Sequence, residues 1–254
     1  MSLPIWTPAA LSSEFRAVSG AWWRLVEAQH QVSTMKLVDT VEEQSLLESL
    51  LEETKPALPP ECDGLDYLLA TPFRYGAVYP KGSRFRRAGR TPGVFYAAEG
   101  VTTALAEMAF YRLLFYAESP DTPLPANAAE YTAFSALVAT TRALDLTAPP
   151  LARDAAAWED PVSYEACQAL ADAARAADGQ AILYRSVRDP ARGMNIALLS
   201  ALAFAAREPV ERQTWHIRLG RADVQALCEF PQRRLGFSLA DFAADPRLSR
   251  FRSG

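Results

Sequence analysis

Hydrophobic positions recur at helical spacing through the first quarter of the chain. Between residues 8 and 31 they fall on one stripe, and between 40 and 54 leucines and valine alternate with glutamates. Each pattern predicts a helix, and the proline-containing segment 55–66 predicts a linker. A helical stripe must be buried against something. The pattern therefore predicts an N-terminal helical hairpin, residues 1–66, packed on a main domain, residues 67–254.

Beyond residue 66 the pattern is mixed. Short apolar runs predict strands over 73–79, 93–98, 131–139, 142–147, 181–188, 195–204 and 214–219. Helical spacing predicts helices over 102–117, 153–158, 163–177 and 221–228, with a short terminal helix in the last fourteen residues. Strands do not alternate regularly with helices, so we predict an α+β fold with a mixed, mainly antiparallel sheet and flanking helices.

Composition excludes several classes of protein. The chain has 254 residues, half of them hydrophobic, which is enough for one substantial core. Its longest apolar stretch, residues 196–206, is far shorter than the ~20 residues of a membrane span. The N-terminus lacks the pattern of a signal peptide. Three scattered cysteines and two histidines fit neither a disulfide framework nor a metal site. We therefore expect a cytoplasmic protein without a metal.

Charge is distributed unevenly along the chain. The net charge is −4, and most of the acidic excess lies in the first 70 residues, where a solvated helix face is the simplest explanation. Six cations and no carboxylate lie between residues 74 and 90: Arg74, Lys81, Arg84, Arg86, Arg87 and Arg90. Guanidinium groups bind phosphate oxygens in pairs of hydrogen bonds. The segment alone fits a small phosphorylated ligand, a nucleic acid or a solvated basic surface.

A glutamate in the helix predicted after this segment is unusual. At helical spacing Glu107 has Thr103, Phe110, Tyr111 and Leu114 as neighbours, a largely apolar face. It stands too far from an N-cap threonine at 102 or 103 to close a capping box. A carboxylate on such a face is costly unless it is paired or functional. Glu107 is therefore either a catalytic group or the partner of an arginine, at 112 or in the cationic segment.

Three other polar groups remain open to two interpretations. Tyr96 lies in the middle of a predicted strand and fits a core position, and Tyr75 could stack on a flat ring or fill a hydrophobic corner. Alternation in the 181–188 strand places Ser186 and Arg188 together at the end of one face. With no histidine nearby in the sequence, Ser186 is better suited to donate a hydrogen bond than to act as a nucleophile.

The order of short motifs resembles the RES-domain family, named for an arginine, a glutamate and a serine. The similar residues span about 70–220 and comprise Arg-Tyr (74–75), Gly-Ser-Arg-Phe (82–85), Gly-Val-Phe-Tyr (93–96), Thr-Ala-Leu-Ala-Glu (103–107), Ser-Val-Arg (186–188) and Gly-Met-Asn (193–195). The resemblance implies an ADP-ribosyltransferase-like fold. It gives Arg84, Glu107 and Ser186 the three name-giving roles, and Arg74, Tyr75, Tyr96 and Asn195 the lining of an NAD pocket.

The resemblance also implies a function. RES proteins include toxins of bacterial toxin–antitoxin pairs, which consume NAD as a substrate rather than hold it as a permanent cofactor. This chain would cleave the nicotinamide–ribose bond, with phosphate or water as the acceptor, and an Xre-like antitoxin would neutralise it. Two alternatives stay open: mono-ADP-ribosylation of a protein target, and a non-catalytic module that binds nucleotides or nucleic acid. On the toxin interpretation, nucleic acid is contacted only through the antitoxin. The sequence leaves homo-oligomerisation open.

Overall fold

The computed structural model describes residues 6–28, 37–74, 82–89, 91–220 and 222–252. Its strands are β1 (Arg16–Glu27), β2 (Phe95–Ala98), β3 (Ala129–Asp145), β4 (Ala181–Arg185), β5 (Met194–Leu198), β6 (Glu211–Leu219), β7 (Asp223–Cys228) and β8 (Arg233–Ser238). Its α-helices are α1 (Pro8–Ser12), α2 (Val41–Glu53), α3 (Tyr67–Arg74), α4 (Val101–Glu118), α5 (Ala155–Trp158) and α6 (Glu165–Ala176). Short 3-10 helices are η2 (Pro60–Cys62), η3 (Leu151–Asp154), η4 (Ala201–Ala203), η5 (Leu239–Phe242) and η6 (Pro246–Arg252).

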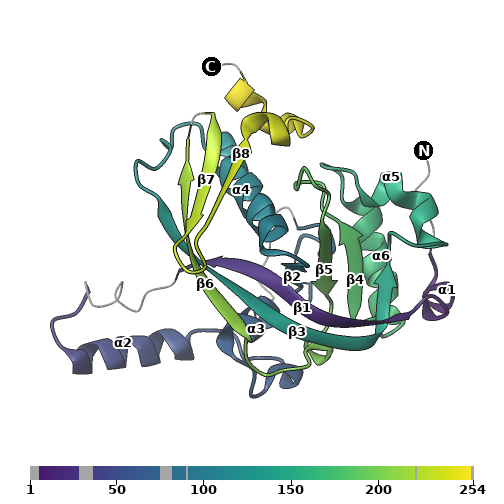
Figure 1. Ribbon diagram of the computed structural model, residues 1–254. Helices are drawn as coiled ribbons and strands as arrows, with labels where there is room; N and C mark the ends of the chain where they lie inside the picture. Colours follow the sequence, from purple (N-terminus) through teal and green to yellow (C-terminus); the bar gives the residue numbers. More distant parts are fainter. Residues whose placement is uncertain (1–5, 29–36, 75–81, 90, 221, 253–254) are drawn as a thin grey trace.

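One sheet organises the molecule (Figure 1). Its order is β1-β2-β5-β4-β3-β6-β7-β8, and β1 also pairs with β3, so the first five strands of that order form a closed circuit of pairings. All pairings are antiparallel except that of β3 with β4. The predicted α+β fold with a mixed, mainly antiparallel sheet is confirmed.

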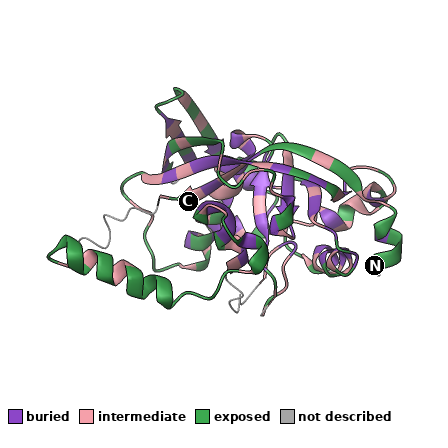
Figure 2. Cartoon of the chain, turned by 90° about the horizontal axis from the view of Figure 1, so that it is seen from below, coloured by how far each residue is buried: buried purple, intermediate pink, exposed green. Residues whose placement is uncertain are grey.

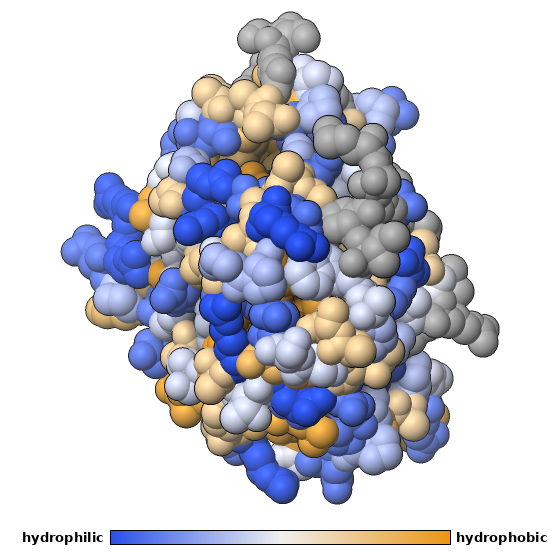
Figure 3. All heavy atoms as spheres, turned by 90° about the vertical axis from the view of Figure 1, so that its right-hand side faces the viewer, coloured by the Kyte–Doolittle hydropathy of each residue, from blue (hydrophilic) through white to orange (hydrophobic). Residues whose placement is uncertain are grey.

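Helices cover both faces of the sheet. Successive residues of a strand point to opposite faces, and β1 shows both: Trp22 packs in one apolar cluster with Leu69 of α3, while Leu25 packs in another with Leu105 of α4. A third cluster lies under α1 and α6, at the β4–β5 end. The surface over that end is a mosaic of hydrophilic and hydrophobic residues (Figure 3). No helix among the described residues is long and apolar enough to cross a bilayer.

The predicted N-terminal helical hairpin is wrong. Residues 16–27, expected in the first helix, form β1, which pairs with β3 from Arg16 to Glu27. The two buried residues of β1, Trp22 and Leu25, pack on opposite faces of the sheet and lie three positions apart, and a spacing of three also fits a helix. Residues 1–66 therefore contribute a strand to the same sheet as the remainder of the chain.

The second predicted helix is confirmed as α2, which begins with a capping box between Thr40 and Glu43. It buries none of its residues and projects from the body (Figure 2). The expectation that its leucines pack on the main domain is therefore wrong, since Leu46 is 61% exposed and Leu50 is 50% exposed.

Other predicted elements need smaller corrections. Residues 223–228, expected in a helix, form β7, and every second residue, at Val224, Ala226 and Cys228, is buried. The two strands predicted over 131–147 are one strand, β3, and β8 was not predicted. Of the strand predicted over 73–79, residues 73 and 74 belong to α3, and the others lie outside the described residues.

Candidate active site

Glu107 lies in the second turn of α4, the helix that crosses the sheet. Gly100 is the N-cap of α4 and no side chain caps the helix, so neither predicted threonine cap is correct. The Glu107 side chain is half-buried. Arg112, a salt-bridge partner considered from the sequence, lies 3.8 Å from Glu27 instead. Among the ion pairs between described residues, none involves Glu107.

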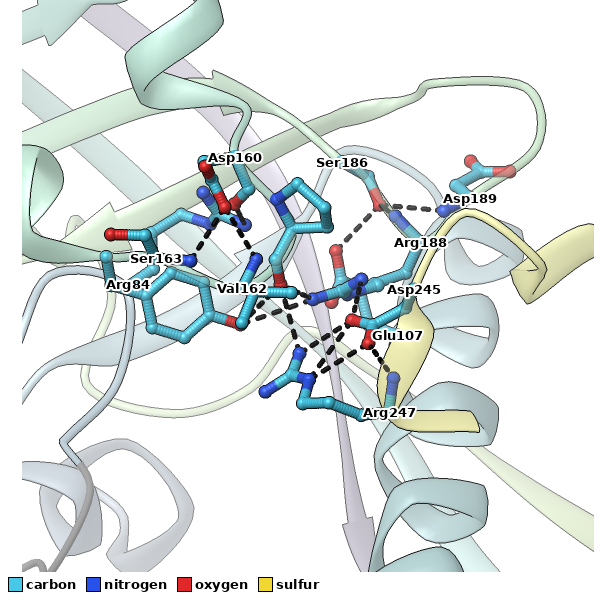
Figure 4. A network of polar contacts seen from close by, with 12 residues as sticks. Arg84, Glu107, Asp160, Val162, Ser163, Ser186, Arg188, Asp189, Asp245 and Arg247 are labelled. Carbon is cyan, nitrogen blue, oxygen red and sulfur yellow. Dashed lines mark hydrogen bonds and ion pairs between the residues drawn. The ribbon is translucent and has the colours of Figure 1, made fainter. Parts of the chain in front are cut away.

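Two neutral groups hold the Glu107 carboxylate. The Ser186 hydroxyl donates to Oε1 at 2.6 Å, and Asn195 Nδ2 donates to the same oxygen at 2.8 Å. Oε2 accepts no hydrogen bond from any described residue. The site therefore contains a carboxylate with a fixed orientation and one oxygen that has no donor among the described residues; Figure 4 shows its contact with Ser186.

Ser186 directly follows β4 and is fully buried. Its oxygen accepts hydrogen bonds from the backbone N–H groups of Arg188, at 3.2 Å, and Asp189, at 2.9 Å. These two bonds occupy the lone pairs of the hydroxyl and leave its proton for Glu107. The sequence-based expectation that Ser186 donates a hydrogen bond is confirmed.

Asn195 is on β5, opposite Ala98 of β2 and Tyr184 of β4. The residue is 2% exposed, and its Oδ1 is buried without a hydrogen-bond partner among the described residues. A buried amide oxygen without a partner is unfavourable unless a water or a ligand supplies a donor. Asn195 therefore orients Glu107 and offers an acceptor beside it.

A buried carboxylate, Asp189, joins the elements that carry these groups. Asp189 Oδ2 accepts from the Thr103 hydroxyl at 2.7 Å and from the Gly193 N–H at 3.2 Å. A Cβ at position 193 would lie 2.2 Å from Thr103 Oγ1, so only glycine permits this approach. These hydrogen bonds join α4 to the loop between β4 and β5. Ser186 begins this loop, and Asn195 lies just after it, on β5.

Arg84 lies apart from these contacts. It is 6% exposed, and its guanidinium donates to the carbonyls of Trp158, at 2.6 Å, and Asp160, at 3.1 Å. It also stacks 4.6 Å from the centre of the Tyr164 ring. In this structure Arg84 holds the segment between α5 and α6 through its backbone and has no hydrogen bond to Glu107 or Ser186.

Tyr96 anchors the loop that carries Arg84. Its hydroxyl lies 2.8 Å from the Ser83 hydroxyl and accepts from the Phe85 N–H at 3.0 Å. Burial raises the pKa of the Tyr96 phenol to about 12, so it stays neutral at physiological pH. Gly82 has φ +66°, and a Cβ there would lie 2.5 Å from the Arg86 carbonyl oxygen, which fixes glycine at this turn.

Of the remaining described cations of the 74–90 segment, Arg86 donates to Thr91, and the other two pair with acidic residues outside the segment. Arg74 pairs with Glu52 of α2 at 2.5 Å and donates to the Pro56 carbonyl at 2.6 Å. Arg87 pairs with Asp172 at 2.5 Å. Tyr75, predicted to line the pocket, lies outside the described residues, as do the cations at positions 81 and 90.

The charge of Glu107 affects a buried tyrosine, Tyr184 of β4. Burial raises the pKa of Tyr184 well above its usual value, and the negative charge of Glu107 raises that pKa further. This phenol therefore remains neutral. Within the described residues no cluster of His, Cys, Asp and Glu could hold a metal ion, and all three cysteines are free.

Sequence reasoning missed an ionic cluster next to Ser186. Arg188, noted only for its place on a strand face, pairs with Asp245 at 2.7 Å, and Arg247 pairs with the same carboxylate at 2.7 Å (Figure 4). Asp245 is 57 residues from Arg188 in the chain, and no local pattern connects the two. Only the packing of η6 on α4 brings them together.

Comparison with known proteins agrees with the motif order. No curated protein matches the sequence. Among solved structures, the crystal structure of the M. tuberculosis MbcT–MbcA toxin–antitoxin complex is similar, with a TM-score of 0.48 and 13% identity, over 83% of this chain and 91% of that chain. The RES domain model matches residues 58–220, more than half of the chain. The chain therefore belongs to the RES-domain family.

Proposed function

We propose that the protein cleaves the nicotinamide–ribose bond of NAD and transfers the ADP-ribosyl group to phosphate. The observation that carries the proposal is the Glu107 carboxylate, held at one oxygen by Ser186 and Asn195 and without a donor from any described residue at the other. Membership of the RES family and the resemblance of its motifs to NAD-consuming toxins support the same reaction.

The chemistry requires such a carboxylate. As the C1′–N bond breaks, its electron pair moves to the pyridinium nitrogen and positive charge develops on the ribose. A fixed negative charge nearby stabilises that state, as carboxylates do in glycoside cleavage. A phosphate oxygen then bonds to C1′ and gives a phosphorylated ADP-ribose. The donors on Glu107 are neutral, so they orient the carboxylate without cancelling its charge.

The substrate would be held by the same groups. Glu107 Oε2 and Asn195 Oδ1 are two acceptors without a donor among the described residues, and ribose hydroxyls supply donors. The predicted pocket residues Arg74, Tyr75 and Tyr96 stay proposals for this role. So does Arg84, whose described hydrogen bonds are to backbone carbonyls.

The biological role follows from the reaction. A protein that consumes NAD without regeneration is toxic to its own cell, so we propose that it is the toxin of a toxin–antitoxin pair, neutralised by an Xre-like antitoxin. The family resemblance supports this assignment. Co-expression with the neighbouring gene product, followed by co-purification and an NAD assay, tests it, and an unneutralised toxin would oppose it.

The reaction is tested by its products. Purified protein is incubated with NAD, with and without inorganic phosphate, and products are identified by mass spectrometry. We expect nicotinamide and phosphorylated ADP-ribose, formed faster with phosphate. Free ADP-ribose at a phosphate-independent rate would show hydrolysis, and ADP-ribose on a protein would show protein modification. No release of nicotinamide by wild-type protein would refute the proposal.

A further inference from the structure

The C-terminal segment from η5 to η6 lies beyond the region that matches the RES family, yet it reaches the site. Asp245 is 1% exposed and receives two guanidinium groups. Arg188 Nη1 donates to its Oδ2 at 2.7 Å, while Arg247 donates from Nη2 to Oδ2 at 2.7 Å and from Nε to Oδ1 at 3.0 Å. The Arg188–Asp245 pair is almost completely buried, with side chains 3% and 0% exposed.

This cluster, Arg188–Asp245–Arg247, fixes the position of Arg188 on three sides. Its guanidinium lies 3.7 Å from the centre of the Phe110 ring of α4. It also donates to the Pro161 carbonyl and, at 3.2 Å, to the Tyr164 hydroxyl. Arg247 donates to the same Pro161 carbonyl at 3.0 Å. The cluster therefore joins the C-terminal segment, α4 and the loop before α6.

Arg188 in turn controls Ser186. The two residues belong to one tight turn, in which the Arg188 N–H donates to Ser186 Oγ at 3.2 Å. That bond, with the one from Asp189 at 2.9 Å, directs the Ser186 proton toward Glu107 Oε1, 2.6 Å away. A change in the place of the Arg188 side chain would move this turn and the donor that orients the proposed catalytic carboxylate.

We propose that Asp245 is a positioning residue of the site, which acts through Arg188 and Ser186 on Glu107. The C-terminal segment is then a working part of the RES active site in this protein, although the family region ends before it. The effect on turnover rests on the proposed function. The effect on the geometry of the turn does not.

A double-mutant cycle on turnover tests the route of this effect. We expect Ser186→Ala and Asp245→Asn each to lower kcat about tenfold, with a smaller change in KM, because each removes or misdirects one hydrogen bond to a charged group. If Asp245 acts through Ser186, the double variant should be no slower than Ser186→Ala alone. The proposal would be overturned if the two losses of kcat multiplied in the double variant, or if Asp245→Asn kept the kcat of the wild type.

Two further variants keep the test decisive if Asp245→Asn does not fold. Arg247→Gln leaves the Arg188–Asp245 pair in place and should give a smaller loss of kcat in the same cycle, and additivity there would also overturn the proposal. Asp241→Asn is the matched control. Asp241 belongs to the same segment and caps η5 through Ser238. It should leave kcat unchanged.

A measurement without NAD separates this proposal from the proposed function. In ¹⁵N-labelled protein, the amide signals of Arg188 and Asp189 report the two bonds to Ser186. They should shift in Asp245→Asn or Arg247→Gln and not in Asp241→Asn. Unmoved signals would refute the positioning role even in an active enzyme. If the signals shift in these variants but the wild-type protein consumes no NAD, the proposed reaction is refuted and the positioning role stands.

Discussion

Glu107, which is half-buried, and Asp245, which is fully buried, accept hydrogen bonds from different kinds of donor (Figure 4). Glu107 receives hydrogen bonds from a hydroxyl and an amide, both neutral, on one oxygen. Asp245 accepts hydrogen bonds from two guanidinium groups. Arg188 and Arg247 both donate to its Oδ2, and Arg247 also donates to its Oδ1. Asp245 is therefore compensated by two cations in the folded protein, while no described cation pairs with Glu107. The contrast indicates that Asp245 stabilises the fold around the site and that Glu107 is kept for a ligand.

The largest expected effect is on stability. Asp245→Asn would leave the buried Arg188, and Arg247 with its side chain 26% exposed, without their counter-charge. Removal of one partner of a buried ion pair costs about 3–5 kcal/mol of unfolding free energy. Denaturant titration should show this loss, while Asp241→Asn should stay within about 1 kcal/mol of wild type because Asp241 is exposed and caps only a short 3-10 helix. Equal stabilities for the two variants would contradict the assigned role of the pair.

The second prediction is that a substitution at Glu107 lowers turnover and not stability. Glu107→Gln keeps the shape of the side chain and removes its charge, so turnover of NAD should fall about 10²–10³-fold, the usual cost of a lost electrostatic contact in a transition state. NAD affinity should fall much less. Melting temperature should not fall, because no described cation loses a partner. Glu99→Gln, an exposed carboxylate just before α4, is the control. Wild-type turnover in Glu107→Gln would exclude the catalytic role.

The third prediction concerns how the stability that Asp245 provides depends on pH. Burial alone would raise the pKa of Asp245, but hydrogen bonds from Arg247 and the charge of Arg188 hold that pKa below its usual value. A lowered pKa in the folded state stabilises the protein above the unfolded pKa of about 4, and this contribution disappears as pH falls through the folded pKa. The stability gap between wild type and Asp245→Asn should therefore be constant from pH 5 to 8. A gap that does not narrow below about pH 4 would show that the charge of Asp245 is not its source.

The sequence predicted the residues around Glu107 but not the role of Asp245. Glu107, Ser186 and Asn195 were identified from motif order, and the structure brings them into one hydrogen-bonded cluster. Their roles in catalysis and NAD binding remain predictions. Asp245 could not be found, because its partner Arg188 is distant in the chain and a lone Asp in a terminal segment reads as a solvated residue.

Errors in the fold had a similar origin. The β1 segment has a helix-like pattern because its two buried residues, Trp22 and Leu25, lie three positions apart and pack on opposite faces of the sheet. Their burial depends on α3 and α4, which lie later in the chain. Arg84 shows the same limit at the level of one residue. An arginine that donates to buried carbonyls and one that binds phosphate have the same local sequence, and only the tertiary contacts to Trp158 and Asp160 distinguish them.

The smallest expected effect concerns the amide that completes the Glu107 arrangement. Two buried side-chain oxygens in the described part of the sheet have no hydrogen-bond partner: Asn195 Oδ1 beside Glu107 and Ser135 Oγ on β3. If the first is kept for a ribose hydroxyl, Asn195→Ala should raise the KM for NAD about tenfold, equivalent to about 1.4 kcal/mol for a lost hydrogen bond. Ser135→Ala removes an equally buried oxygen that contacts none of the site residues. It should leave KM unchanged and keep or slightly raise the melting temperature, because a desolvated hydroxyl is replaced by a methyl group. Steady-state kinetics and thermal melts on the pair compare them directly. If both variants bind NAD as wild type does, the unpartnered Asn195 oxygen is a packing feature, and Glu107 Oε2 alone is left to hold the ribose.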